Sequence, residues 1–289
     1  MANLNDVAKR YYETQLAAGS TTTESAGDLG SGRLLAFERE VLSTYGSQVS
    51  ISDKAKSLRK FGRNGTVDTA LETIWTPGGN EVYCTTNAIT HFSSSSGSDT
   101  QQIIIEGHTV AGTGTSAVFT FSVQTVTLSG QTKVALTTPL ARVSRAYNDD
   151  STDLVGNIYV YEDDTVTAGV PQTANKLHLQ IPAGSNKSFK ASTTFSNNDY
   201  FALTGMYASV TKSSGNAAVD FFLEVRFVGK TFTVKEQMTI TAGSAGVELF
   251  FDPVIVIPQN ADVRIRAVAT ATNIPCAATF EGYIASVTT

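Results

Sequence analysis

The stretch VDFFLEVRFVGKTFTVKEQMTI (219–240) decides the fold class, because its first half alternates between two faces. The apolar face consists of Val219, Phe221, Leu223, Val225 and Phe227, and the opposite face carries Asp220, Glu224 and Arg226. A period of two residues is the pattern of a half-buried strand. Gly229 and Lys230 then predict a tight turn before a second strand. The stretch therefore predicts an antiparallel hairpin with its apolar face inward.

The same alternation recurs along the chain beyond about residue 64. VFTFSVQTV (118–126) alternates strictly, and DVRIRAVA (262–269) does so too. The second of these puts Val263, Ile265 and Ala267 inward and Asp262, Arg264 and Arg266 outward. No helical periods separate these strands, so a parallel α/β sheet is not expected. The pattern predicts a mainly β protein built from antiparallel, jelly-roll-like β-sandwiches.

Composition agrees with this fold class and bounds the domain organisation. Only 16% of the 289 residues are charged, below the usual quarter, and 41% are hydrophobic. Residues 1–63 differ from the rest, with helical spacing in 4–18 and 33–46 around a glycine-rich linker. We therefore expect a partly helical N-terminal arm over 1–63, a first β domain over 64–172 and a second β-sandwich over 173–289. The boundary is placed in the acidic, Gly/Pro-containing segment 162–176.

The compartment is inferred from the N-terminal residues and the cysteines. The N-terminus lacks the apolar segment of a signal peptide, and no run is long enough to span a bilayer. Cys84 and Cys276 are the only cysteines. A disulfide between them is conceivable, but the absence of an export signal favours free, buried thiols in a reducing cytoplasm.

A search for catalytic, cofactor or metal residues predicts none of the three. His91, His108 and His178 are far apart, and none has a second ligand at metal spacing. A Ser/His/Asp triad can be assembled on paper around SSSSGSD (93–99), but coincidence explains it in a serine-rich chain. The acidic segment at 148–153, followed by 162–164, could offer oxygens to calcium but lacks EF-hand spacing, so a solvated turn is favoured. We expect no enzyme and no cofactor.

One basic segment stands out in a chain of net charge -5. Its candidate partner-contact residues are Lys54, Lys56, Arg59, Lys60, Phe61 and Arg63. Nucleic acid binding is disfavoured because one such patch makes few phosphate contacts, and a solvated face is the plain alternative. The favoured interpretation is an arm that docks on an acidic protein surface, where opposite potentials orient assembly. Trp75, shortly after the segment, is expected in the core.

Several short pieces of the sequence resemble one group of proteins. They are SLRKFGRNGTVDTALETIWTPGGNEVY (57–83), TPLARVSRAYN (138–148), GNIYVY (156–161) and the C-terminal stretch 249–286 with its DVRIR and F-x-G-Y elements. Together they cover roughly residues 55–289 and resemble virion structural proteins of tailed bacteriophages, of the marine or cyanobacterial type. The resemblance implies a non-enzymatic β protein, located in the virion and assembled in the host cytoplasm.

The expected function is therefore a capsid decoration (cement) protein that binds the shell exterior and stabilises it. Its expected partners are the major capsid protein or other virion proteins and copies of itself, with a trimer favoured because closed symmetric oligomers dominate. Neither nucleic acid nor membrane is expected as a partner. The alternatives are a tail, collar or fibre-base protein, or a carbohydrate-binding β-sandwich. A host glycan would then be sought at SNNDYF (196–201), with Tyr200 as the test residue.

Overall fold

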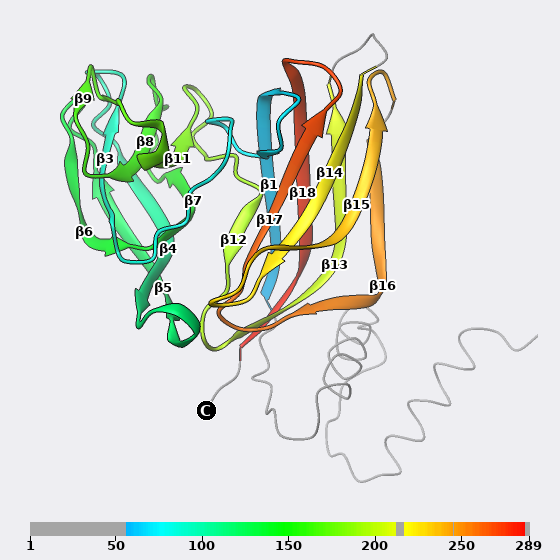
Figure 1. The fold of residues 1–289 in the computed structure, drawn as a ribbon. Coiled ribbons are helices and arrows are strands. Elements are labelled where there is room, and N and C mark those ends of the chain that lie inside the picture. Colours follow the sequence, from blue (N-terminus) through cyan, green and yellow to red (C-terminus); the bar gives the residue numbers. More distant parts are fainter. Residues whose placement is uncertain (1–55, 212–216, 245, 287–289) are drawn as a thin grey trace, which may run out of the picture. The chain divides into compact units, whose positions relative to one another are not determined.

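The computed structural model of the chain describes residues 56–211, 217–244 and 246–286 (Figure 1). The helices expected within 4–18 and 33–46 lie outside these residues, as does Lys54. The predicted fold class is confirmed, because the regular structure of the described chain consists of antiparallel strands apart from two short 3-10 turns. Within the described residues, no helix has the length and apolar character needed to cross a membrane.

The first sandwich consists of a four-stranded and a three-stranded sheet (Figure 1, left). The four-stranded sheet has the order β11 (Leu177–Ile181), β8 (Ile158–Glu162), β3 (Ile89–Ser94), β6 (Val134–Leu140). The other sheet has the order β5 (Val118–Thr127), β4 (Gln102–Ala111), β7 (Arg142–Asn148). A two-stranded ribbon of β9 (Val166–Thr167) and β10 (Val170–Pro171) and the 3-10 turns η1 (Gly114–Ser116) and η2 (Ala174–Lys176) complete this part. Phe92, Ile103 and Ile105 are fully buried in its core.

The second sandwich consists of two larger sheets (Figure 1, right). One has the order β1 (Lys56–Val67), β18 (Ile274–Ser286), β13 (Asp199–Val210), β16 (Val247–Ile257). The other has the order β12 (Ser192–Thr194), β17 (Asp262–Ala269), β14 (Ala218–Arg226), β15 (Thr233–Thr241), and β2 (Glu72–Thr73) pairs with β17. Phe201, Phe221 and Phe280 lie in the core between them, and Phe201 stacks on Phe195 with 4.7 Å between ring centroids.

The hairpin that decided the fold class forms as expected, with one difference. Val219, Phe221 and Leu223 are fully buried, and β14 pairs with β15 in antiparallel register. The turn is closed by the Lys230 amide, which donates to the Phe227 carbonyl at 2.9 Å. Phe227, expected on the inner face, is 44% exposed because β14 ends one residue before it. Alternation therefore predicted the strand but not its end.

Strands and strand pairs cross both of the expected boundaries. Residues 56–63, assigned to the arm, are part of strand β1, which pairs with the C-terminal strand β18 from Lys56↔Ile284 onward. The first sandwich continues past residue 172, because β11 pairs with β8. The second sandwich therefore takes its strands from both ends of the described chain. Charged residues on both faces of 56–63 hid the strand period from the sequence analysis.

Candidate functional site

The basic segment is divided between two faces of β1. Arg59, Phe61 and Arg63 are exposed and lie on one face of the strand, and Lys56 is exposed at its start. Lys60 points the other way and is only 7% exposed. Its Nζ donates to the Ser144 carbonyl on β7 of the first sandwich. Lys60 is therefore a buried contact between the two sandwiches and not part of the exposed surface.

The exposed side chains of β1 belong to a larger surface across the sheet. Phe61 lies in register with Thr279 of β18, which lies in register with Tyr207 of β13. In the next row, Arg59 lies in register with Glu281 of β18. Glu281 lies in register with Gly205 of β13, and Gly205 lies in register with Phe250 of β16. We call the aromatic and basic members of this surface the aromatic–basic face; they are Arg59, Phe61, Arg63, Tyr207 and Phe250. Two acidic side chains lie on the same surface, Glu281 beside Arg59 and the exposed Glu248 in register with Tyr207.

The aromatic–basic face leaves large aromatic surface in contact with solvent. Phe61 is 42%, Tyr207 38% and Phe250 73% exposed. Phe61 packs edge-on against Phe189 with 5.4 Å between ring centroids. Arg59 Nε lies 3.4 Å from Glu281 Oε2, but both side chains are solvent-accessible, so this ion pair adds little stability. Aromatic and arginine side chains in one patch are the composition of protein–protein interfaces.

Burial changes the acid–base behaviour of Lys60. Removal from water, together with the nearby cations Lys190 and Arg145, lowers the pKa of its ammonium to about 7. Glu106 and Glu81 act in the opposite direction. This lysine cannot present a permanent positive charge to a partner, which separates it from Arg59 and Arg63.

A buried cluster of ion pairs, here called the ionic core, covers the outer face of the sheet that contains β14 and β17. Asp262 accepts from Arg142 Nε of the first sandwich at 2.9 Å and from Arg226 at 2.5 Å. Glu224 accepts from Arg264 at 2.7 Å and from Arg266 at 2.6 Å. Asp262, Glu224 and Arg264 lie on the outward face of their strands, as expected, but they are covered and less than 9% exposed.

Aromatic rings complete the ionic core. The Arg226 guanidinium lies 4.4 Å from the centroid of the Tyr83 ring, and the Arg264 guanidinium lies 3.6 Å from that of Phe232. Burial alone would raise the pKa of Asp262, but Arg142 and Arg226 outweigh it, so the pKa is lowered below its ordinary value. Asp262 is thus a charged carboxylate held between two arginines, and its role is to join the sandwiches.

A second buried pair lies near Lys60. Lys190 Nζ lies 2.7 Å from Glu81 Oε1, and both side chains are 4% exposed. Glu81 also accepts from Ser192 Oγ at 2.6 Å, and Lys190 lies over the Trp75 ring at 5.7 Å. Trp75 is 3% exposed, which confirms the expected core position. These buried charges are satisfied by one another.

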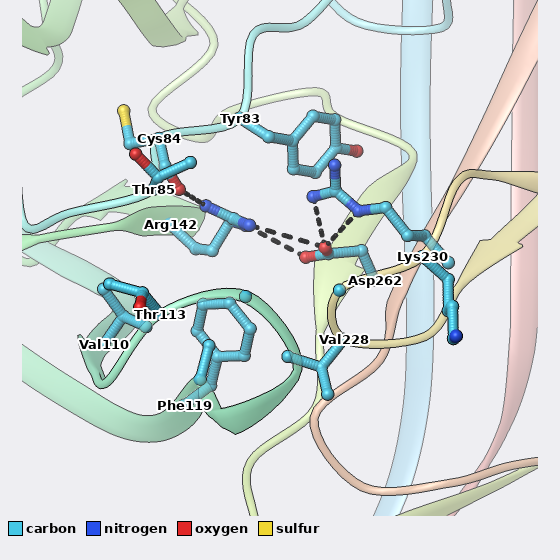
Figure 2. A pocket seen from close by; sticks show the side chains of 14 residues that line it. Tyr83, Cys84, Thr85, Val110, Thr113, Phe119, Arg142, Val228, Lys230 and Asp262 are labelled. Atoms are coloured by element: carbon cyan, nitrogen blue, oxygen red, sulfur yellow. Dashed lines mark hydrogen bonds and ion pairs between the residues drawn. The ribbon is translucent and has the colours of Figure 1, made fainter.

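A cavity of about 160 Å³ opens beside the ionic core and is lined by both sandwiches (Figure 2). Thr113 and Phe119 come from the first sandwich, and Val228 and Lys230 from the β14–β15 turn. Arg142 spans the wall, donating to Asp262 at one end and to the Cys84 carbonyl at the other (Figure 2). Because Asp262 in this wall is paired with Arg142 and Arg226, the cavity offers shape more than reactive chemistry.

The Ser/His/Asp triad considered around residues 93–99 does not form in the described part of the chain. Ser94 Oγ donates to Asp99 at 2.5 Å, and Asp99 also accepts from the backbone amide of Gly156 at 2.9 Å. His91 is instead near Asp163, at 3.7 Å. The Ser94–Asp99 pair therefore closes a loop and has no histidine to activate it.

The acidic segment considered for calcium and the SNNDYF segment considered for a glycan both make contacts within the protein. Asp163 of the acidic segment accepts from Lys133 Nζ at 2.6 Å. In SNNDYF, Asp199 accepts from Ser286 Oγ at 2.7 Å, and the Asn197 amide donates to the Phe119 carbonyl at 3.0 Å. Tyr200 lies in β13, in register with Ala285. These contacts favour a turn and a strand start over calcium or glycan binding.

Three side chains of metal-ligand type converge at the first sandwich: Cys84, Glu162 and His178. The sequence analysis missed them because 78 residues separate Cys84 from Glu162, and 16 separate Glu162 from His178. No short-range spacing signals such a set. Both cysteines are free and buried, which confirms that expectation.

Comparison with known proteins gives no family for this chain. No protein-family model matches it, and no curated protein matches it. Among solved structures, the chain is similar to one of the infectious bursal disease virus Gx strain, with 10% sequence identity and a TM-score of 0.23. The match covers 87% of this chain and 78% of that one. A crystal structure of the VP2 subviral particle of the same virus matches at 10% identity and a TM-score of 0.21, over 87% and 77% of the two chains. Scores of this size carry no argument about function.

Proposed function

We propose that the protein is a non-enzymatic structural component of a tailed-phage virion, specifically a decoration protein that binds the capsid exterior. The sequence resemblance supports the class of protein. The aromatic–basic face carries the proposal in the structure, because it presents Phe61, Tyr207 and Phe250 with two arginines on an open sheet. In this role the protein stabilises the shell by adding buried interface between neighbouring subunits.

The chemistry of the face defines the surface that it fits. Aromatic side chains and arginine dominate the energetics of protein interfaces, whereas lysine is depleted there. Arg59 and Arg63 flank Phe61 at two-residue intervals on the same strand. A matching surface would have an apolar pocket for the aromatic rings and acidic side chains at its rim. We assign this surface to the major capsid protein or another virion protein.

The ionic core favours a structural role over a catalytic one, because its charged groups are used in contacts between the two sandwiches. Asp262, Arg142 and Arg226 connect β17 and β14 of one sandwich to β7 of the other. Removing one partner of such a buried pair costs about 3–5 kcal/mol, because the remaining charge is left buried without a counter-charge. A subunit that bridges shell proteins needs such a connection in order to transmit force between its contacts.

The first experiment measures the copy number of the protein in purified particles by quantitative mass spectrometry against the major shell protein. Copies on the order of hundreds support decoration of the lattice, and about six to twelve copies would place the protein on the tail axis, where ring symmetry sets the number. Absence from particles would refute the virion proposal altogether. Light scattering of the purified protein measures its oligomeric state alongside the copy number.

The second experiment tests the face directly. The variant Arg59→Glu/Arg63→Glu should reduce incorporation to less than a tenth of wild type, because both charges reverse on exposed side chains. The matched control Lys187→Glu/Lys235→Glu makes the same net charge change at exposed lysines elsewhere in the described chain. Equal incorporation of the two variants would refute docking through the aromatic–basic face.

A further inference from the structure

Three donor atoms meet at one point of the first sandwich. Cys84 Sγ lies 3.5 Å from His178 Nε2 and 3.5 Å from Glu162 Oε1, and the latter two atoms are 3.0 Å apart. Cys84 and His178 are 8% and 2% exposed, and the Glu162 side chain is 28% exposed. Each residue directs toward the other two the atom by which it would bind a metal ion.

The backbone fixes this convergence. Glu162 ends β8, and His178 lies on the neighbouring strand β11. Leu177 and Leu179 pair with the consecutive residues Tyr161 and Val160, so His178 is the extra residue of a β-bulge. Bulges re-aim a side chain, and here the ring is aimed toward the segment that precedes β3, which carries Cys84. The Cys84 carbonyl is held by Arg142, which fixes the third ligand.

The distances match those of a tetrahedral metal site. Zinc lies about 2.3 Å from thiolate sulfur and about 2.0–2.2 Å from imidazole nitrogen and carboxylate oxygen, so tetrahedral angles separate the donors by about 3.4–3.6 Å. Two of the three separations here are 3.5 Å, and only the nitrogen–oxygen distance of 3.0 Å must widen by a few tenths of an ångström. A metal ion fits with a small rotation of the Glu162 carboxylate.

The charges of the set also match a divalent ion. A thiolate and a carboxylate carry two negative charges, and a neutral imidazole adds none, so a divalent cation makes the buried site neutral. Burial lowers the pKa of His178, which keeps its ring neutral and able to bind. Burial and Glu162 raise the pKa of the Cys84 thiol to about 12, so the thiol is protonated until metal displaces its proton.

The neighbouring cations do not oppose a bound metal ion. Lys190 donates to the His178 carbonyl at 3.0 Å, but its charge is paired with Glu81. Arg142 contacts the Cys84 carbonyl, and its charge is paired with Asp262, which it shares with Arg226. The Lys190 charge is therefore balanced before a metal ion enters, and the Arg142 charge is balanced in part.

We propose that Cys84 Sγ, Glu162 Oε1 and His178 Nε2 form a binding site for a divalent transition metal of the zinc type. Sulfur and imidazole ligands select such metals and disfavour calcium and magnesium. Water supplies the fourth ligand on the exposed side of Glu162. On binding, the Cys84 S–H bond breaks, its proton leaves to solvent and the sulfur–metal bond forms. The metal then ties the segment before β3 to strands β8 and β11.

The test uses Co²⁺ and Zn²⁺ with the full-length protein. Cobalt bound to a thiolate gives an ultraviolet charge-transfer band, and tetrahedral cobalt gives visible d–d bands. The chain has only two cysteines, and Cys276 is buried with a pKa raised to about 12 as well, so Cys276→Ser is a matched control. We expect both band sets at one equivalent of Co²⁺ in wild type and Cys276→Ser, and neither in Cys84→Ser.

Zinc affinity is measured by competition with a chromophoric chelator. Losing even an outer-shell partner costs about 10–100-fold in metal affinity, so Cys84→Ser should bind Zn²⁺ at least 100-fold more weakly than wild type. Circular dichroism reports whether each variant is folded. Glu162→Gln, at a partly exposed position, is the second variant and should weaken binding at least tenfold with the fold intact. No charge-transfer band in wild type, or bands that survive both Cys84→Ser and Glu162→Gln, would overturn the proposal.

Discussion

Replacing Asp262 by alanine tests the ionic core most directly. The carboxylate accepts from Arg142 and Arg226 and also from Thr194 Oγ1 at 2.6 Å. Its removal leaves two guanidinium groups without a counter-charge. We expect the variant to fold but to lose a large share of its stability, because the uncompensated charges remain partly buried.

The size of the loss follows from the exposure of the two arginines. The Arg226 side chain is 22% exposed and can turn toward water, whereas Arg142 is 9% exposed and cannot. One buried charge therefore loses its partner fully, which costs about 3 kcal/mol at the lower end of the range for broken buried pairs. With an m-value of about 3 kcal/mol/M in urea, the midpoint of unfolding should fall by about 1 M.

The assay is urea unfolding followed by fluorescence of Trp75, which lies in the core. Asp163→Ala, which removes a carboxylate exposed on the surface, is the control and should leave the midpoint unchanged. The double variant Arg142→Met/Asp262→Ala should lose less stability than the sum of its single variants, by at least about 1 kcal/mol. A loss below about 1 kcal/mol in Asp262→Ala, or strict additivity, would refute the joining role of the ionic core.

Three further outcomes are expected. Between the folded pKa of Lys60, about 7, and its unfolded value of 10.5, the unfolded chain binds the extra proton, so stability should rise with pH. The rise from pH 7 to 9 is about 2–3 kcal/mol, and urea midpoints across this range should flatten in Lys60→Met. Gly62→Ala should greatly reduce folded yield, since its methyl carbon would lie 2.2 Å from the Ile74 carbonyl oxygen; a normal thermal midpoint would contradict this. Cys84 and Cys276 should react with a thiol reagent only after unfolding, because burial raises both pKa values to about 12.

Local patterns predicted the strands well because each strand of a half-buried sheet records its own environment. Phe221 and Leu223 are buried as their alternation required, and the fold class followed from such segments. The burial of Glu224 could not be predicted in this way. Its face is polar in sequence, and its partners there are Arg264 and Arg266, with Phe232 lying over the Arg264 guanidinium.

The candidate site depended on longer-range information. Arg59 and Arg63 were singled out by charge and Phe61 as the aromatic residue between them, and the structure puts all three on one face. Lys60 was grouped with them because charge density carries no direction, whereas strand geometry sends every second residue inward. The Cys84 cluster had no signal at all, since its ligands meet only after two strands and a loop have packed together.

The pairing of β1 with β18 has a consequence for synthesis. The ribosome makes β1 long before β18, and the two strands are almost the whole described chain apart. Contacts of such sequence separation form late in folding. The aromatic–basic face needs β1, β13, β16 and β18 together, so a chain that stops before residue 274 cannot build it. Prematurely terminated products would therefore lack the aromatic–basic face altogether, and the presence of this face on a chain would report that its synthesis had passed β18.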